Sequence, residues 1–181
     1  MQIKQEDSLL YQSIAICRLL FELHHSKFLE SDFYKVNCFK NGNSVFKEIL
    51  SHSGGIGNPA TLQTMLYLLL VCPRELLDDV EKKELDNEIN SFCNTFKPDR
   101  YETTYGSDKC AINFSKHLRN AVAHSLCKYP NAGEFIFRDN NPNNTKEIFE
   151  IRMSSYDVES ILEIIQNKIT SFLNKRNHPK K

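Results

Sequence analysis

The chain has 181 residues, and its 23 basic residues balance its 23 acidic residues, so the formal net charge at neutral pH is zero. A chain of this length fits one domain with a core of its own. Zero net charge excludes a global field that would draw the protein to nucleic acid or to an anionic membrane, so any nucleic-acid contact has to be local.

The cysteines and the apolar runs indicate in which cellular compartment the protein lies. Six cysteines are spread along the chain with no C-x-x-C pair and no regular spacing, which argues against a disulfide framework or a zinc site and favours reduced thiols. No basic stretch leads into an apolar one at the N-terminus, which argues against a secretory signal. The longest apolar run, residues 65–72, is too short to span a bilayer. We therefore expect a cytoplasmic protein that does not bind a membrane.

The first third of the chain predicts one clear helix. Between residues 7 and 28 the apolar side chains recur at steps of three and four, which indicates an amphipathic helix capped by Asp7 or Ser8. Residues 30–58 are mixed, and a short helix around residues 45–50 would be interrupted on both sides. The glycine-rich residues 54–57 lack the Lys-Ser/Thr pair of a P-loop, so we interpret them as a plain loop.

The middle of the chain predicts a buried helix followed by a charged one. Asn58 and Pro59 suit the start of a helix that runs to about Val71 with almost no polar face, which is typical of a central, buried helix. Residues 75–96 continue with a helical pattern whose outer face is charged. The acidic residues between positions 78 and 86 would be enough for a metal site, but a solvated helix surface explains them with no further assumption, so we expect no metal there.

The last third predicts a helix, a hairpin and a closing helix. Ser107 or Asp108 is expected to cap a helix from Lys109 to about Cys127. Two β-rich segments, residues 134–138 and 147–152, flank a polar turn and indicate a β-hairpin.

A final helix begins at Ser154 or Ser155. The predicted fold class is mainly α, with the hairpin inserted before the last helix. We expect a single helical domain over residues 1–174 and a short, basic, disordered tail over residues 175–181.

The helix from Lys109 to Cys127 has two contrasting sides. Winding it at 100° per residue gathers an apolar face, formed by Ala111, Phe114, Leu118, Ala121, Val122 and Leu126. The opposite stripe is polar and consists of Asn113, Lys116, His117, Asn120, His124 and Cys127. A solvated face is normally filled with Glu and Lys pairs, whereas this one prefers Asn, His and small residues. We therefore expect the stripe to meet a ligand or a second subunit.

Within this helix, Arg119-Asn120-Ala121-Val122-Ala123-His124 matches the R-polar-x-x-x-H motif and resembles the HEPN (higher eukaryote and prokaryote nucleotide-binding) families. The surroundings agree, because the motif ends a late helix, a β-hairpin follows and another helix closes the domain. With the segment that begins at Asn58 upstream, the order resembles small plasmid- and chromosome-borne bacterial HEPN-like proteins. The resemblance implies an up-down helical bundle that forms a homodimer through the motif helix and places two Arg/His sets in a shared cleft.

The resemblance also implies an activity. Many such proteins are metal-independent endoribonucleases of the toxin or defence type, so no metal or other cofactor is expected. In that chemistry Arg119 would hold the phosphate, His124 would exchange a proton near neutral pH, and Asn120 would orient the imidazole or bind a phosphate oxygen. Lys116 and His117 share the stripe and are candidates for binding the RNA substrate.

Two points stay open at this stage. On a regular helix Arg119 and His124 are about 140° apart, so either the helix ends or distorts near His124, or the arginine reaches across Ala123, or residues from two subunits combine, and we favour the dimer. The alternative function is a non-catalytic module that binds RNA, a nucleotide, or a protein partner such as an antitoxin. A purely structural interpretation has His124 capping helix carbonyls and Arg119 paired with a carboxylate.

Overall fold

The computed structural model describes residues 7–39, 44–131 and 133–177. Its helices are α1 (Ser8–His25), α2 (Asp32–Asn37), α3 (Ser44–His52), α4 (Pro59–Leu66), α5 (Asp79–Cys93), α6 (Phe114–Ala123) and α7 (Ser155–Asn177). The strands are β1 (Tyr101–Thr103), β2 (Cys127–Lys128), β3 (Glu134–Asn140) and β4 (Ile148–Ser154). The predicted class, mainly α with a hairpin before the last helix, is confirmed.

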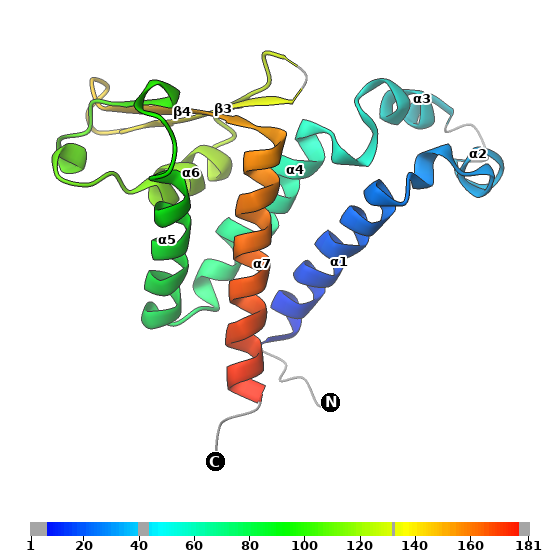
Figure 1. Cartoon of the computed structure of the whole chain (residues 1–181), viewed down its shortest axis with the longest axis horizontal. Coiled ribbons are helices and arrows are strands. Elements are labelled where there is room, and N and C mark those ends of the chain that lie inside the picture. The colour runs from blue at the N-terminus through cyan, green and yellow to red at the C-terminus, as the bar shows by residue number, and fades with distance from the viewer. Residues whose placement is uncertain (1–6, 40–43, 132, 178–181) are drawn as a thin grey trace.

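The helices form a bundle with the sheet across one end. In Figure 1, α1 and α5 run away from the end at which both chain termini lie, whereas α4 and α7 run towards it. Helices α5 and α7 pack against each other, and α6 lies between α5 and strand β3. The long helices therefore form the body of the molecule, and α6 lies where these helices meet the sheet.

The sheet is larger than the predicted hairpin. Its four strands are antiparallel in the order β1-β4-β3-β2, and Ile151 of β4 lies between Phe137 of β3 and Tyr101 of β1. Along β3 every second side chain is buried, as the two-residue period of a strand requires. The buried positions are Phe135, Phe137 and Asp139. The strand extends to Asn140, so Asp139 belongs to the core-facing side of the sheet and not to the turn in which we had placed it.

The central helix is buried as predicted, but its second half is not α-helical. Asn58 caps α4 by accepting from the Thr61 N–H, and Leu62, Met65 and Leu66 of α4 are buried. Residues 67–71 then form a π-helical turn, and residues 72–75 a 3-10 turn. Pro73 supplies no N–H to the carbonyl four residues earlier and its ring crowds that carbonyl, which gives a physical reason for the change in winding.

Both ends of the described chain differ from the prediction. The Asp7 side chain does not cap α1, and its Oδ1 instead accepts from Arg176 Nη1 at 2.8 Å. Arg176 also binds Glu81, which completes a capping box with Asp78 at the start of α5. Helix α7 therefore includes residues 175–177, which we had assigned to the tail, and residues 178–181 lie outside the described part.

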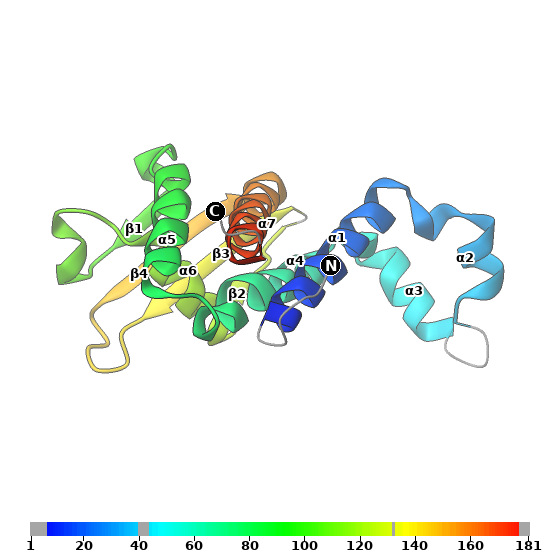
Figure 2. The ribbon, with the colours of Figure 1, turned by 90° about the horizontal axis from the view of Figure 1, so that it is seen from below.

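A protruding arm is formed by the turn Phe28–Glu30, α2 and α3. Figure 2 shows α2 and α3 lying beyond the far end of α1, away from the helices that carry the sheet. The short helix expected around residues 45–50 is α3, and the predicted loop after it contains Gly54 and Gly55 with positive φ values of 89° and 76°. Within the described parts of the chain, no helix has the length and apolar character needed to cross a membrane.

Candidate functional site

Helix α6, which carries the motif, is shorter than expected. It has ten residues and begins at Phe114, because Asn113 accepts from the Lys116 N–H at 3.0 Å and thereby caps its first turn. Residues 106–109 form a separate 3-10 turn, so Asp108 is not the cap that we predicted. Cys127 lies in β2, beyond the end of the helix.

The motif ends where the helix ends. His124 is the C-terminal cap of α6, and Ser125 follows with a left-handed φ of 55°. The Leu126 N–H bonds the Ala121 carbonyl at 2.8 Å and the Ser125 N–H bonds the Val122 carbonyl at 3.2 Å, which is the Schellman arrangement. Of the three alternatives for the motif geometry, a helix that ends at His124 is therefore the one observed within a single chain.

The His124 side chain is exposed to solvent. No hydrogen bond or ion pair of its ring is found among the residues that the structure describes. Four residues separate it from Asn120, so the two side chains leave the helix on the same face. An imidazole in this position has both nitrogen atoms available for proton exchange with a ligand.

Arg119 is half-buried beside a second guanidinium. Arg74 makes a two-point salt bridge with Asp86 at 2.7 and 2.8 Å, and the Ser115 hydroxyl donates to the same carboxylate at 2.6 Å. Burial and the nearby charge of Arg74 lower the pKa of Arg119, whereas Asp86 and Asp139 oppose that change. Arginine nevertheless stays protonated in proteins. The motif therefore contains one guanidinium, Arg119, and a second guanidinium, Arg74, lies near it in a salt bridge with Asp86.

Asn120 is anchored to the sheet. Its Nδ2 donates to Asp139 Oδ2 at 3.1 Å, and its Oδ1 accepts from Arg119 Nη2 at 3.4 Å. Asp139 is buried on the inner side of β3. The amide thus links the buried carboxylate to the guanidinium of the motif.

His117 is buried and not part of an exposed stripe, which corrects our expectation. Its side chain is 1% exposed, with Nδ1 2.7 Å from Asp139 Oδ2 and Nε2 3.1 Å from Asp108 Oδ2. The ring also stacks on Phe149 at 4.3 Å with an interplanar angle of 11°. Each ring nitrogen atom therefore lies within hydrogen-bond distance of a carboxylate oxygen, so the ring links the turn before α6 to strand β3. Strand β3 and the turn before α6 cover this part of the helix, which the helical wheel could not reveal.

The cluster around His117 extends to neighbouring polar groups. The Thr103 hydroxyl donates to Asp108 Oδ2 at 2.6 Å, and the Tyr105 ring lies 4.7 Å from the His117 ring. Burial, together with the charge of Asp139 and a hydrogen bond to it, raises the pKa of Tyr105 to about 12. Tyr105 therefore stays neutral at physiological pH and contributes a hydroxyl to the cluster.

The two remaining residues of the predicted stripe, Lys116 and Cys127, differ in their exposure. Lys116 is exposed on α6. The hydrogen bonds that Glu147 accepts from Asn141 and from the Gly106 N–H lower the pKa of the Glu147 carboxyl, and the charge of Lys116 lowers it by a smaller amount. Burial raises the pKa of the Cys127 thiol to about 12. Lys116 is therefore accessible to a ligand, whereas Cys127 stays a thiol.

Sequence reasoning missed Arg74, Asp86 and the two carboxylates that hold His117. A signal existed for Asp139, because it continues the two-residue alternation of Phe135 and Phe137 into the polar segment. Asp108 lies nine residues before His117 in a turn, and no periodic pattern connects the two. The acidic segment 78–86 is partly engaged in ion pairs rather than only solvated. In the described ranges, no three His, Cys, Asp or Glu side chains are grouped as a metal ion would require.

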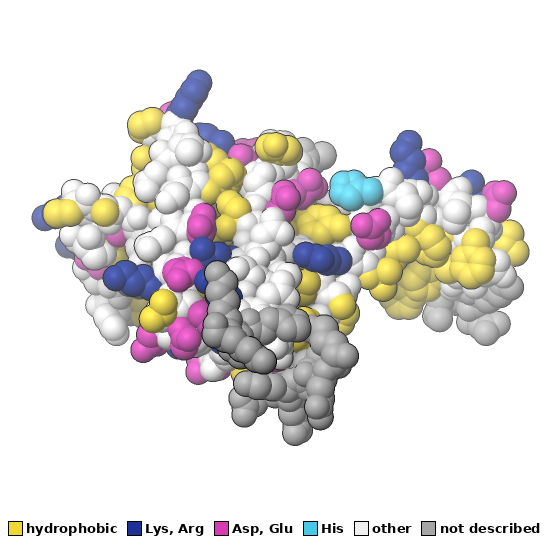
Figure 3. All heavy atoms as spheres, turned by 60° about the horizontal axis from the view of Figure 1, so that its bottom comes forward, with side chains coloured by type: hydrophobic (Ala, Val, Ile, Leu, Met, Phe, Trp, Pro, Cys, Tyr) yellow, Lys and Arg dark blue, Asp and Glu magenta, His cyan; other side chains and the backbone are white. Residues whose placement is uncertain are grey.

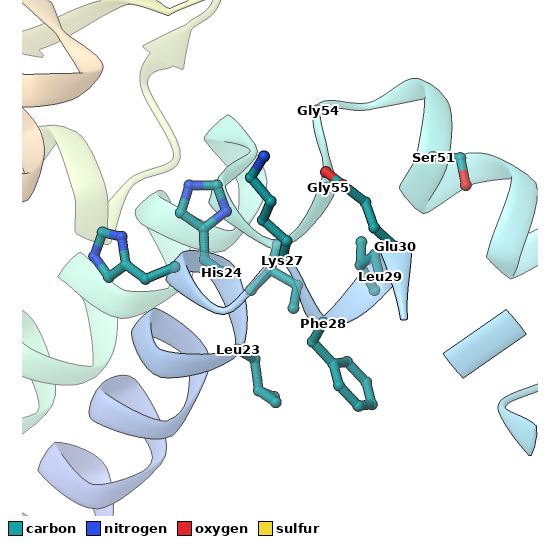
Figure 4. Close-up of a pocket in the computed structure, with 11 residues that line it drawn as sticks. Leu23, His24, Lys27, Phe28, Leu29, Glu30, Ser51, Gly54 and Gly55 are labelled. Carbon is teal, nitrogen blue, oxygen red and sulfur yellow. The ribbon is translucent and has the colours of Figure 1, made fainter. Parts of the chain in front are cut away.

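A second candidate is a cavity of about 550 Å³ between the end of α1, the turn Phe28–Glu30 and the loop before α4. Figure 4 shows His24 and Lys27 beside this space, opposite Gly54 and Gly55. A Cβ at Gly57 would lie 2.6 Å from Cε1 of His24, so the glycine permits the ring to rest on the backbone. The cavity is separate from the motif, because none of its lining residues belongs to α6.

The comparisons with known proteins identify the family. The model of the family described as HEPN pEK499 p136 matches residues 1–176, which include the motif, the hairpin and all but the last residue of α7. Neither the curated proteins nor the solved structures contain a match. HEPN domains often dimerise and often act as ribonucleases. Because the family model spans nearly the whole chain, the protein is a member of the HEPN pEK499 p136 family of the HEPN superfamily.

Proposed function

We propose that the protein is a metal-independent endoribonuclease of the toxin or defence type, with Arg119, Asn120 and His124 as its catalytic residues. The observation that carries the proposal is the exposed His124 at the cap of α6, one turn beyond an asparagine that is anchored to a buried carboxylate. Membership of the HEPN superfamily, whose domains are often ribonucleases, supports it.

The reaction is a transesterification within the RNA chain. The 2′-oxygen attacks the adjacent phosphorus, the bond from phosphorus to the 5′-oxygen breaks, and the products carry a 2′,3′-cyclic phosphate and a 5′-hydroxyl. His124 removes the proton from the 2′-hydroxyl, and Arg119 stabilises the negative charge that grows on the phosphate oxygens. Lys116, which is exposed on the same helix, binds a neighbouring phosphate of the RNA.

The leaving 5′-oxygen also needs a proton. We propose that His124 of the partner subunit supplies it, in a homodimer in which two α6 helices face each other. HEPN domains often dimerise, which supports this arrangement. His117 is buried, so we assign it a positioning role in place of direct substrate binding: it holds Asp139, which holds Asn120.

The second candidate function is a non-catalytic module that binds RNA, a nucleotide or a protein partner. The zero net charge favours it, because each phosphate that a protein neutralises normally takes one lysine or arginine. Part of the charge of Arg119 is moreover compensated by Asp86 and Asp139.

An RNA cleavage assay in EDTA separates the two functions. Wild type, Arg119→Ala and His124→Ala are compared on mixed-sequence RNA, with His52→Ala as the control because His52 is another exposed histidine at the end of a helix. We expect cleavage by wild type and His52→Ala, 5′-hydroxyl ends on the products, and a loss of about 10²-fold or more in the other two variants.

Three results would contradict the endoribonuclease proposal. Cleavage that persists in both Arg119→Ala and His124→Ala rejects the assigned residues. Cleavage of an oligonucleotide with 2′-deoxyribose at every position rejects the attack by the 2′-oxygen. No cleavage of any RNA by the folded wild type favours the binding module, which is then tested by RNA binding of the same variants.

A further inference from the structure

Arg119 has fewer hydrogen-bond partners than two other half-buried arginines, Arg100 and Arg176. Its one hydrogen bond within the described residues joins Nη2 to Asn120 Oδ1 at 3.4 Å. Arg100 and Arg176 each bind a carboxylate and a backbone carbonyl oxygen. A guanidinium that is partly removed from water without a carboxylate in contact is typical of a site that binds an anion. We therefore searched around Arg119 for a second group that would hold the same anion.

Arg74 is brought to the face of α6 that carries Arg119. Ser115 and Arg119 are one helical turn apart, so their side chains leave α6 on the same face. The Ser115 hydroxyl donates to Asp86 Oδ1 at 2.6 Å, and the two-point salt bridge of Arg74 ends on the same carboxylate. The nearby charge of Arg74, which lowers the pKa of Arg119, agrees with this placement. Two guanidinium groups therefore lie close together on one side of the motif.

The irregular end of the central helix determines where Arg74 lies. Residues 67–71 form the π-helical turn, which packs against α6, and Arg74 belongs to the 3-10 turn that follows. A π-helical turn holds more residues than an α-helical turn, so it rotates the side chains that follow about the helix axis. Such turns often occur at functional sites. The change in winding thus has a consequence at the motif, because it places Arg74 within reach of Asp86.

The salt bridge leaves part of the Arg74 guanidinium unused. A guanidinium has five N–H donors, and Asp86 accepts from Nη1 at 2.7 Å and from Nη2 at 2.8 Å. The Nε–H and the second N–H of Nη2 lie side by side on the adjacent edge, which we call the outer edge of Arg74. No partner of Nε is found among the residues that the structure describes, and the side chain is 20% exposed. Two parallel donors of this kind match two oxygen atoms of a phosphate.

The local charges also suit a phosphodiester. Asp86 contacts Arg74 and compensates one of the two guanidinium charges, so one positive charge remains for the single negative charge of a phosphodiester. On the face drawn in Figure 3, basic side chains are interspersed with acidic ones and do not form a broad positive surface. The whole chain has no net charge. A phosphate therefore has to be held by a fixed local group of donors and not by a general field.

We propose that Arg74 is a second phosphate-binding residue, and that its outer edge and the guanidinium of Arg119 hold one phosphate group of the RNA between them. The inference rests on the proposed function for the identity of the ligand. Asp86 and Ser115 are positioning residues, because they fix Arg74 and do not contact the phosphate. The assignment adds a residue from outside α6 to the site.

Binding of an RNA that cannot be cleaved tests the role of Arg74. The probe is a fluorescent 2′-O-methyl RNA octamer, whose 2′-oxygen atoms cannot attack, and the readout is fluorescence anisotropy. We expect Arg74→Gln to raise the Kd about 10-fold and to lower the salt slope of log K by about 0.7, as the loss of one phosphate contact requires. An unchanged Kd in Arg74→Gln, or no binding by folded wild type, overturns the inference.

Arg100→Gln is the matched control. It breaks a comparable pair, because Arg100 Nη2 lies 2.6 Å from Asp157 Oδ2 and the two side chains are 31% and 13% exposed. None of the hydrogen-bond partners of Arg100 belongs to α6. Its Kd should stay within about 2-fold of the wild-type value. Equal losses of affinity in Arg74→Gln and Arg100→Gln would assign a purely structural role to Arg74.

A double variant tests whether the two arginines share one phosphate. If they do, Arg119→Gln already loses that contact, so Arg74→Gln combined with Arg119→Gln should bind within about 2-fold of Arg119→Gln alone. A Kd that rises by the product of the two single effects places Arg74 on a different phosphate and overturns the shared contact.

A conservative variant guards against loss of fold. Arg74→Lys keeps a positive charge opposite Asp86 but has no planar edge with two donors. Denaturant unfolding should therefore give it nearly the wild-type stability, while its Kd rises about 3-fold or more because one of two phosphate hydrogen bonds is lost. Wild-type affinity in folded Arg74→Lys would contradict the two-point contact.

Failure of the ribonuclease proposal is distinguishable from failure of this inference. Wild type that binds the octamer through Arg74 but cleaves no RNA with 2′-hydroxyls refutes only the ribonuclease proposal. Wild type that cleaves RNA, with the same KM, kcat and octamer Kd in Arg74→Gln, refutes only the role of Arg74.

Discussion

Two histidines of α6, His117 and His124, are seven residues apart and point from the same face of the helix, yet they meet opposite surroundings. His117 is enclosed by Asp108, Asp139 and the ring of Phe149. His124 lies at the end of the helix, exposed to solvent. The spacing of residues on a helix fixes the face from which a side chain projects but not how exposed that side chain is. Its exposure depends on which other segments of the chain pack against that turn of the helix. The buried histidine joins α6 to β3 and to the turn before the helix, and the exposed one is accessible to a ligand.

The largest expected effect tests the buried histidine. His117→Ala leaves two buried carboxylates without the ring that contacts both of them, so it should lower the free energy of unfolding by about 3–5 kcal/mol. His124→Ala removes an exposed side chain and should change it by less than about 0.5 kcal/mol. Denaturant unfolding of both variants gives the two values. A similar loss of unfolding free energy in both variants would contradict the conclusion that His117 contributes to stability and His124 does not.

The next effect separates stability from positioning. Asp139→Asn and Asp108→Asn each remove one charge beside His117, so each should cost about 2 kcal/mol of stability. Only Asp139 also holds Asn120, so only Asp139→Asn should slow RNA cleavage, by about 10-fold, under conditions where both proteins are folded. Unfolding curves and initial cleavage rates provide the test. Equal cleavage by the two variants would mean that the anchor of Asn120 has no catalytic role.

A smaller effect concerns the acid sensitivity of the Arg119 surroundings. Burial of Asp86 acts to raise its pKa, but the hydrogen bonds from Arg74 and Ser115 outweigh this and hold the pKa below its ordinary value of 3.8. The unfolded chain then binds a proton at higher pH than the folded one, so this contribution is complete above about pH 4 and is lost as the pH falls through the native pKa. Asp86→Asn should therefore lose less stability than wild type on acidification from pH 5 to pH 2, as measured by denaturant unfolding at the two pH values. If the free energy of unfolding falls by the same amount in both proteins between pH 5 and pH 2, Asp86 does not have a lowered pKa in the folded protein.

The smallest effect tests the end of the helix. Ser125 adopts a left-handed conformation that glycine adopts without a Cβ penalty, so Ser125→Gly should raise the free energy of unfolding by about 0.5 kcal/mol. Because the cap geometry stays the same, His124 should keep its position and the cleavage rate should not change. Thermal unfolding and the RNA assay measure the two quantities. A lower melting temperature would indicate that the Ser125 side chain has a role of its own.

Local periodicity predicted most of the fold. The three- and four-residue steps located α1 and α7. The Asn58-Pro59 start and the apolar run after it located α4, and the β-rich composition of two segments located β3 and β4. The short strands β1 and β2 have three and two residues, too few to show a two-residue alternation, so no local pattern could reveal them. The end of α6 at His124 was one of several alternatives, because a serine occupies the left-handed position where glycine usually gives the signal.

The candidate site was predicted only in part. The motif placed Arg119, Asn120 and His124 on one helix, and the structure adds what surrounds them. Asp139 lies 22 residues from His117 and on another element, so their contact depends on how β3 packs on α6. We predicted from the helical wheel that His117 is exposed, because it is polar. It is buried because Asp108 and Asp139 supply hydrogen-bond partners for both nitrogen atoms of its ring.

The contact of Arg176 with Asp7 and Glu81 has a practical consequence for anyone who shortens this protein. One guanidinium near the end of α7 joins the beginning of α1 to the first turn of α5. A truncation after residue 174, where the sequence alone places the domain boundary, would leave two carboxylates of low exposure without their shared counter-ion. Versions made for crystallisation or for tethering should therefore extend through at least Asn177.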